Sequence, residues 1–291
     1  MFQLFQRTIY PLLRDSNELL FEIEFYKILF YLLFVISGYA TFSVSECFKA
    51  FLPITNIHDG FVSCFLVFYL FIPFLNILIR NLNKKLHLLL VGLCIFTYTI
   101  LGSVPKIDVT MNYVSWFCVL YFIASYIRNY GCFSIKEKQW KWFMLISISL
   151  SIISVICILK CNQVLNKNFF PYYFVSDCNS IFAVSTAICS FMFFKNLKLK
   201  NNKTINLISR STFGVLLIHA NSNIMRQWLW KDTFENVSYF SSEYLWIHLL
   251  VTIIIIYIVC TFIDYLRITY IEAPFFKIID SKLNIKLFSY D

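Results

Sequence analysis

Charged residues are scarce in this sequence, at 14% of its 291 residues, whereas about 25% is usual in soluble domains. Hydrophobic residues make up 59%. This balance excludes an ordinary soluble protein and indicates an integral membrane protein, for which one domain over residues 1–291 is the simplest prediction. The net charge of +9 would favour a nucleic-acid partner in a soluble protein. Here the basic residues lie between apolar runs, so we expect the lipid bilayer as partner and no nucleic acid.

Glycine is also scarce, with six residues. No glycine-rich phosphate loop, G-x-S-x-G or H-E-x-x-H occurs, so a nucleotide site of the soluble type is not supported. Residues 1–24 are rich in charge and have no apolar core, so they do not form a secretory signal. No inverted repeat of the kind that many transporters have is visible.

Cysteine is not scarce, but its pattern favours neither disulfides nor metal. Six of the ten cysteines lie inside apolar runs, where a thiol behaves as a small hydrophobe. Cys157 and Cys161 are four residues apart, but no histidine or carboxylate stands beside them to complete a zinc site. We therefore expect no metal.

Long apolar runs are the main positive feature. A helix needs about 20 apolar residues to cross the hydrocarbon core of a bilayer. Eight stretches qualify, so the sequence predicts an all-α bundle of eight transmembrane helices. They are residues 25–44, 61–79, 86–104, 111–127, 140–159, 175–194, 208–229 and 244–263.

The distribution of Lys and Arg agrees with this count. The two ends and every second loop carry 19 basic residues, whereas the alternating loops carry 6. Because basic residues concentrate in short cytoplasmic loops, we expect both termini in the cytoplasm. Lys27 is assigned to the cytoplasmic side and Lys49 to the outer side. The tail, residues 267–291, mixes charge with aromatic residues and is predicted to be an amphipathic cytoplasmic segment.

The seventh predicted span contains polar residues. Four of them would share one face of a continuous helix, at spacings i, i+3, i+4 and i+7: His219, Ser222, Asn223 and Arg226. An ionisable group facing lipid costs at least about 2.5–3.5 kcal/mol at the bilayer centre, so this face is expected to line a cavity or the bundle interior. His219, the only histidine expected deep in a span, could exchange a proton near neutral pH. Arg226 could bind a phosphate or carboxylate, or snorkel to the interface.

Two further polar pairs are candidate substrate-binding residues. Asn76 and Arg80 follow Pro73 in the second span, where a substrate groove and a simple packing kink both remain open. Asn112 and Trp116 begin the fourth span, where sugar stacking and an interfacial aromatic belt both remain open.

Four segments carry a resemblance to a known family. They are R-T-I-Y-P (residues 7–11), F-L-V-F-Y-L-F-I-P-F-L-N (65–76), S-T-F-G-V-L-L-I-H with R-Q-W-L-W (211–219 and 226–230) and I-E-A-P-F-F (271–276). In this order they resemble segments of acyltransferase family 3, the integral-membrane O-acetyltransferases of bacterial surface polysaccharides. The resemblance implies a multi-pass protein of the bacterial cell membrane. It also implies two more N-terminal helices than the eight predicted here, so the chain looks like the family without its first two helices.

The resemblance implies acetyl-CoA as donor and a hydroxyl of a lipid-linked or exported glycan as acceptor. The family's first helix carries the histidine regarded as the catalytic base, and here no histidine precedes His58. His219 matches a later histidine of the family and is expected in a supporting role, with Asn223 and Arg226 binding substrate. Two alternatives remain open, namely a glycan transporter or flippase and an inactive, truncated remnant of the enzyme.

Overall fold

The computed structural model describes residues 2–52, 60–105, 107, 109, 111–131, 135–198 and 200–282, and the side chains within these ranges from residue 17 on, except those of 280 and 282. Helices and turns, but no strands, occur in these ranges, which confirms the predicted all-α class. The chain divides into two compact units. Unit 1 is Met1–Thr55 with Lys200–Asp291, and unit 2 is Asn56–Leu199.

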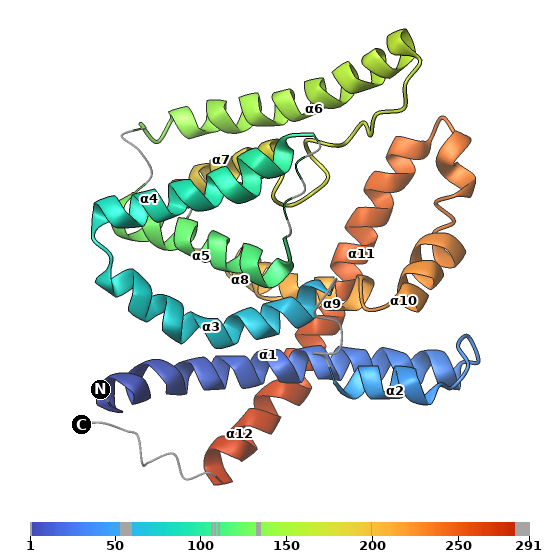
Figure 1. Ribbon diagram of the computed structural model, residues 1–291. Coiled ribbons are helices and arrows are strands. Elements are labelled where there is room, and N and C mark those ends of the chain that lie inside the picture. Colours follow the sequence, from blue (N-terminus) through green and yellow to red (C-terminus); the bar gives the residue numbers. More distant parts are fainter. Residues whose placement is uncertain are drawn as a thin grey trace. The chain divides into compact units, whose positions relative to one another are not determined.

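Unit 2 contains long apolar helices (Figure 1). They are α3 (Phe61–Asn81), α4 (Lys84–Cys94), α5 (Tyr113–Tyr130), α6 (Gln139–Leu165) and α7 (Ile181–Lys195). The α4 helix continues through η1 (Ile95–Ile100) and η2 (Leu101–Ser103). Three of these helical segments are long and apolar enough to cross a membrane: Phe61–Asn81, Lys84–Ser103 and Gln139–Leu165. The second, third and fifth predicted spans are therefore confirmed as helices of suitable length and composition.

Aromatic and hydroxyl side chains hold unit 2 together. Phe61 and Phe65 of α3 each meet the ring of Phe117 on α5, with centroids 5.2 and 5.4 Å apart. Between α6 and α7, the Ser147 and Thr186 hydroxyls are 2.6 Å apart. Both kinds of contact suit membrane helices, where small polar residues and close packing replace the hydrophobic effect as the cause of association.

The sixth predicted span is shorter than expected. Its helix, α7, begins only at Ile181, because the preceding segment is fixed by side chains: the Ile181 amide donates to Ser103 Oγ at 3.1 Å, and Asn179 Nδ2 donates to the Tyr98 carbonyl at 2.8 Å. Its 15 residues extend for about 22 Å. This is less than the hydrocarbon thickness of about 30 Å.

Unit 1 begins with a helical hairpin. α1 runs over Phe2–Ile36, so the first predicted span ends earlier than residue 44. The chain turns at Gly38, whose φ of +75° favours glycine, and α2 (Val44–Phe51) lies beside α1 (Figure 1). The Tyr31 hydroxyl on α1 donates to the Ser43 carbonyl at 2.9 Å and fixes the start of α2.

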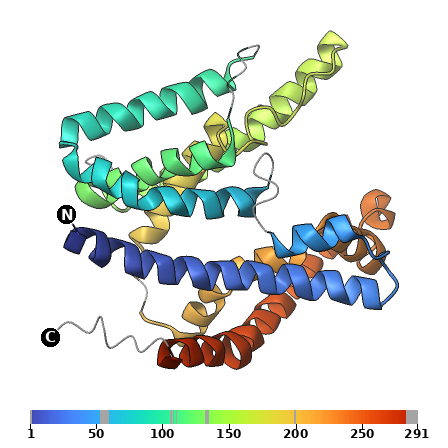
Figure 2. The same ribbon diagram turned by 60° about the horizontal axis from the view of Figure 1, so that its bottom comes forward.

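The last predicted span is a helix and extends beyond its predicted end. α11 (Leu245–Arg267) continues through η5 (Ile268–Glu272) into α12 (Ala273–Lys282), and Leu245–Ile279 is long and apolar enough to cross a membrane. α12 meets α1 (Figure 2), where the rings of Phe275 and Phe21 stack at 4.7 Å. Residues 268–282 of the predicted tail are therefore helical, and residues 283–291 lie outside the described part of the chain.

Short segments stand in place of the seventh predicted span. They are α8 (Lys203–Arg210), α9 (Thr212–His219), α10 (Asn223–Gln227) and the π-helical turn η3 (Trp228–Thr233), followed by the short 3-10 turn η4 (Ser238–Ser241). The prediction of one continuous helix over residues 208–229 is wrong.

Candidate functional site

The helix break lies at residues 220–222, immediately after His219. The Asn221 side chain folds back and donates to the Leu217 carbonyl at 3.1 Å. Ser222 is extended, at φ −153° and ψ 169°, and its Oγ accepts from the Met225 amide at 3.1 Å, which starts α10. These side chains offer the backbone an alternative to the helix. His219 and Arg226 therefore do not share one face of a continuous helix, and the predicted polar stripe is wrong in that respect.

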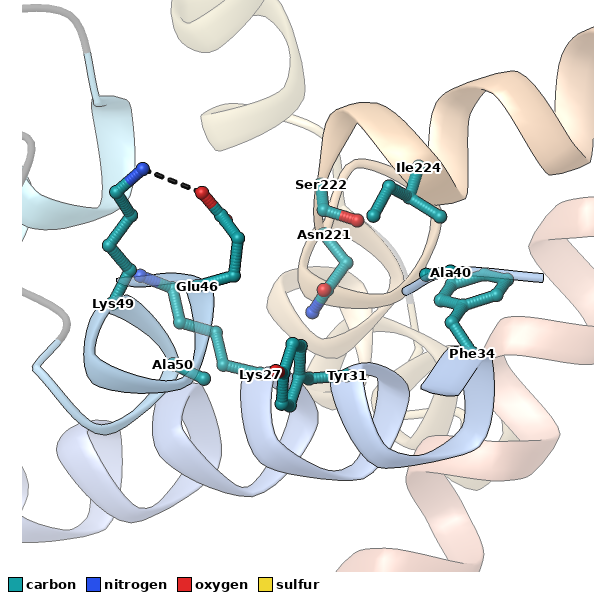
Figure 3. Close-up of a pocket in the computed structure, with 10 residues that line it drawn as sticks. All are labelled: Lys27, Tyr31, Phe34, Ala40, Glu46, Lys49, Ala50, Asn221, Ser222 and Ile224. Carbon is teal, nitrogen blue, oxygen red and sulfur yellow. Dashed lines mark hydrogen bonds and ion pairs between the residues drawn. The ribbon is translucent and has the colours of Figure 1, made fainter. Parts of the chain in front are cut away.

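The broken segment lines a polar cavity of about 140 Å³ (Figure 3). Six polar side chains surround it: Lys27 and Tyr31 from α1, Glu46 and Lys49 from α2, and Asn221 and Ser222 from the break. Non-helical backbone at membrane depth is tolerated where it is buried in protein or lines a cavity. The break and the cavity thus form one feature, which we call the polar cavity.

Two cations line the polar cavity, and each has an acidic neighbour on its own helix. Lys49 Nζ lies 2.7 Å from Glu46 Oε1, and both side chains are about half exposed. The ammonium group of Lys27 is half-buried and makes no hydrogen bond or salt bridge with the described residues. Glu24, one turn earlier on α1, interacts electrostatically with this ammonium group.

Two residues that line the polar cavity were predicted on opposite sides of the membrane. The distribution of basic residues assigned Lys27 to the cytoplasmic side and Lys49 to the outer side. Both side chains line the same cavity, because α2 folds back along α1. The predicted sidedness of the two residues stays a prediction.

His219 faces a different cavity from the one that Asn221 and Ser222 line. It borders an apolar cavity of about 250 Å³. Its Nδ1 lies 2.6 Å from the Val215 carbonyl, which can only accept, so Nδ1 carries a hydrogen and donates it. Asn223 and Arg226, on α10, are exposed. Neither residue is among the described residues that line the polar cavity.

A buried ionic cluster, which the sequence did not indicate, fixes the helices around these cavities. Arg267 on α11 is 3% exposed and directs each guanidinium nitrogen to a different carboxylate. Nε lies 3.0 Å from Asp264, Nη2 lies 3.1 Å from Glu22 of α1, and Nη1 contacts Glu272 of η5. The Tyr26 hydroxyl of α1 donates to Asp264 at 2.8 Å. We call these five residues the ionic cluster.

The sequence signal for this cluster was weak. Arg267 was counted as a cytoplasmic charge, and Glu22 lies outside the predicted spans, 245 positions from Arg267. Only tertiary structure brings such distant residues together.

Burial raises the pKa of the Glu22 carboxyl to about 7, because the effect of desolvation exceeds the opposing attraction of Arg267.

At Gly214, helix α9 closely approaches Asp264 of the ionic cluster. A Cβ atom at this position would lie 2.2 Å from Asp264 Oδ1, so only glycine permits this close approach of α9 to α11. Gly214 and His219 lie on the same eight-residue helix. The close approach at Gly214 therefore fixes the position of α9 against α11.

The remaining sequence candidates belong to unit 2 and have local partners there. Asn76 Oδ1 accepts from the Tyr121 hydroxyl at 2.8 Å, and Arg80 is exposed. Asn112 caps α5 by accepting from the Ser115 amide at 2.9 Å. Trp116 is 2% exposed, so its ring is packed inside unit 2. Their assignment to substrate binding stays a prediction.

The histidines differ from expectation. His87, in the first turn of α4, is fully buried, with Nε2 3.1 Å from the Phe122 carbonyl, whereas His219, expected deep in a span, is half-buried. His58 lies outside the described residues. No group of three or more His, Cys, Asp or Glu side chains placed to hold a metal ion occurs in the described part of the chain.

Comparison with known proteins gives one match. No curated protein and no solved structure matches the chain. A family model described as an acyltransferase domain, that of acyltransferase family 3, matches residues 23–265. The matched region includes the polar cavity, α9 and most of α11. The chain therefore belongs to acyltransferase family 3.

Proposed function

We propose that this protein transfers an acetyl group from acetyl-CoA to a hydroxyl of a surface polysaccharide or of its lipid-linked precursor, in the bacterial cell membrane. Membership of the acyltransferase family carries the proposal. The polar cavity supports it, because it brings together a carboxylate, hydroxyl groups and ammonium groups, which are side chains of the kind that acyl transfer uses.

The size of the polar cavity limits what it can hold. Its volume of about 140 Å³ is below the range of roughly 300–1,000 Å³ that is usual for whole small-molecule ligands. It fits the reacting end of a substrate, namely the thioester and the attacked hydroxyl, but not an entire coenzyme A.

Three lining residues supply the required chemistry. The acceptor oxygen attacks the thioester carbonyl carbon, a C–O bond forms, and the C–S bond breaks to release coenzyme A as a thiolate that takes up a proton. Glu46 is the carboxylate among the described lining residues, and it accepts the proton of the acceptor hydroxyl. Ser222 Oγ already accepts from the Met225 amide, so its own hydrogen is free to stabilise the oxyanion. Lys27 binds an anionic group of the substrate.

His219 has a positioning role in this proposal. Its ring donates to the Val215 carbonyl and so fixes the last turn of α9, directly before the break. Asn223 and Arg226, exposed after the break, bind the part of the substrate that lies outside the cavity.

The test is transfer of labelled acetyl from acetyl-CoA to glycan by membranes that contain the full chain. We expect Glu46→Gln to lower kcat about 100-fold or more. His219→Ala should lower kcat with little change in KM, and His219→Asn, whose amide can donate to Val215, should restore much of it. Lys231→Met, an exposed change on η3, serves as the control. Unchanged transfer by Glu46→Gln and His219→Ala would remove the site assignment.

A transporter for the same glycans is the second candidate, because broken helices that line a cavity are also typical of transporters. It predicts labelled glycan crossing the bilayer with no acetyl transfer. Absence of both activities would favour an inactive member of the family.

A further inference from the structure

Basic side chains gather at one end of unit 2. Arg80 and Arg128 stand in the last turns of α3 and α5, and Lys84 and Lys85 begin α4. Both arginine side chains are exposed, and neither forms a salt bridge with a described carboxylate. Basic residues at the ends of apolar helices are common topology signals, so charge alone does not define a site here.

The ends of these three helices lie together within unit 2. α3 and α5 run in the same direction, because Phe61 meets Phe117 near the start of both helices, at 5.2 Å, and Asn76 meets Tyr121 further along both. The start of α4 reaches the end of α5, where Lys84 Nζ lies 5.8 Å from the centroid of the Tyr130 ring. The last turns of α3 and α5 are therefore neighbours.

The two arginines converge on one polar pair, which topology alone does not require. The Tyr121 hydroxyl of α5 donates to Asn76 Oδ1 of α3 at 2.8 Å. Arg80 follows Asn76 by four residues, and Arg128 follows Tyr121 by seven, so each arginine shares a helix face with one member of the pair. Both guanidinium groups interact electrostatically with the Tyr121 hydroxyl. Two cations from different helices thus face one region.

Exposed apolar side chains precede both arginines. Ile77, three residues before Arg80, is 59% exposed, and Leu120, two turns before Arg128, is 39% exposed. In a membrane such side chains contact acyl chains, while arginines at helix ends reach the headgroups. Guanidinium groups bind phosphate through paired hydrogen bonds. A phosphate headgroup with acyl chains attached matches this arrangement of charge and apolar surface.

We propose that Arg80 and Arg128 form a binding site for the headgroup of an anionic phospholipid. The phosphate lies between the two guanidinium groups, and the acyl chains lie along Ile77 and Leu120. The distribution of basic residues predicts that this end of unit 2 faces the cytoplasm, and basic pockets between helices on that side bind such headgroups. The inference does not depend on the proposed function, whose residues belong to unit 1. It gives Arg80 a lipid ligand that is not a reactant.

The test counts the lipid molecules that the purified protein retains. Full-length protein in detergent micelles is titrated with dioleoylphosphatidylglycerol and, separately, with dioleoylphosphatidylcholine, and native mass spectrometry gives the occupancy of each lipid. The two lipids share the phosphate and both acyl chains, and they differ in net charge. No acetyl-CoA is present, so catalysis does not affect the result. We expect one phosphatidylglycerol to bind at least about tenfold tighter than phosphatidylcholine.

Variants separate this site from the general charge of the helix ends. Arg80→Gln and Arg128→Gln should each lower the affinity for phosphatidylglycerol about tenfold, and the double variant should lose the preference over phosphatidylcholine. Lys85→Gln is the matched control, because it removes an equal, exposed charge from the same end of unit 2. It should change the affinity less than about threefold. Thermal unfolding of each variant shows whether it is folded.

Three results would overturn the inference. The first is equal affinity for the two lipids. The second is an equal effect of Arg80→Gln, Arg128→Gln and Lys85→Gln, which would reduce the preference to the summed charge of this end. The third is displacement of phosphatidylglycerol by inorganic phosphate or coenzyme A, which would assign the two arginines to a soluble anion.

Discussion

The two units of this protein place charge in opposite ways. In unit 1, Arg267 and Asp264 are 3% and 0% exposed, and they form the centre of the ionic cluster. In unit 2, every Lys, Arg, Asp and Glu that the structure describes is exposed, and contacts between rings and between hydroxyls hold the helices. Unit 2 is thus built as a conventional set of apolar helices, whereas unit 1 is held by directed polar contacts.

This difference explains why the candidate site belongs to unit 1. Apolar contacts are individually weak and tolerate small shifts. A guanidinium with three carboxylate partners permits few arrangements, and buried ion pairs contribute more to defined geometry than to net stability. The ionic cluster holds α1, α9 and α11, and these elements carry Lys27, the break after His219 and the apolar cavity.

Removing the centre of the ionic cluster should have the largest effect. Arg267→Met leaves three carboxylates without their cation, and we expect a loss of about 3–5 kcal/mol in the free energy of unfolding in mixed micelles. Lys277→Met, an exposed change on α12, should cost less than about 0.5 kcal/mol. A variant that also carries Glu22→Gln, Asp264→Asn and Glu272→Gln should recover part of the loss. Equal stability of the two single variants would mean that the cluster holds nothing together.

The pH dependence of stability should differ between the units. The pKa of Glu22 is about 7 in the folded protein and has an ordinary value of 4.5, so the folded state binds the proton more tightly. Its stabilising contribution is complete below pH 4.5 and is lost as the pH rises through 7, by at most about 3 kcal/mol. The neighbouring charged groups are Arg267, Asp264 and Glu272.

Glu22→Gln resembles the protonated form, so stability measured between pH 5 and pH 8 should fall less steeply than in the unmodified protein. Glu137→Gln, in the exposed loop before α6 of unit 2, should keep the original slope. A slope that Glu22→Gln leaves unchanged would show that another group is responsible.

Two glycine substitutions compare the units directly. Gly214→Ala forces a methyl group against the Asp264 carboxylate, and we expect a loss of about 1–3 kcal/mol together with reduced acetyl transfer. Gly92→Ala, inside α4 of unit 2, meets nothing within 4 Å and should be neutral or stabilising by up to about 1 kcal/mol. Unfolding in mixed micelles measures both, and similar losses would contradict the close approach at Gly214.

The smallest effect is expected in unit 2. Ser147→Ala removes the hydroxyl pair with Thr186 between α6 and α7, which should cost about 0.6–1.7 kcal/mol, as interhelical hydrogen bonds in membranes do. Acetyl transfer should remain unchanged once stability is corrected for. A loss of activity larger than the loss of folded protein would indicate that unit 2 contributes to the site.

Hydrophobic run length was sufficient to predict much of the fold. It located the helices over residues 61–79, 86–104, 140–159 and 244–263, because a long apolar run has few alternatives to a helix. It was wrong over 208–229, where Asn221 and Ser222 satisfy backbone groups locally and end the helix. Hydropathy averages over about 20 residues and does not register two polar side chains that break a helix.

The sequence by itself determined that this is an apolar, helical protein, and its motifs indicated acyltransferase family 3, which the family match over residues 23–265 confirms. It also pointed to the neighbourhood of His219. Only the tertiary structure decided which residues surround the cavities, because Lys27 of α1, Lys49 of α2 and Ser222 of the break are far apart in the sequence and line one cavity. The ionic cluster likewise joins Glu22 to Arg267, and no local pattern encodes a contact across that separation.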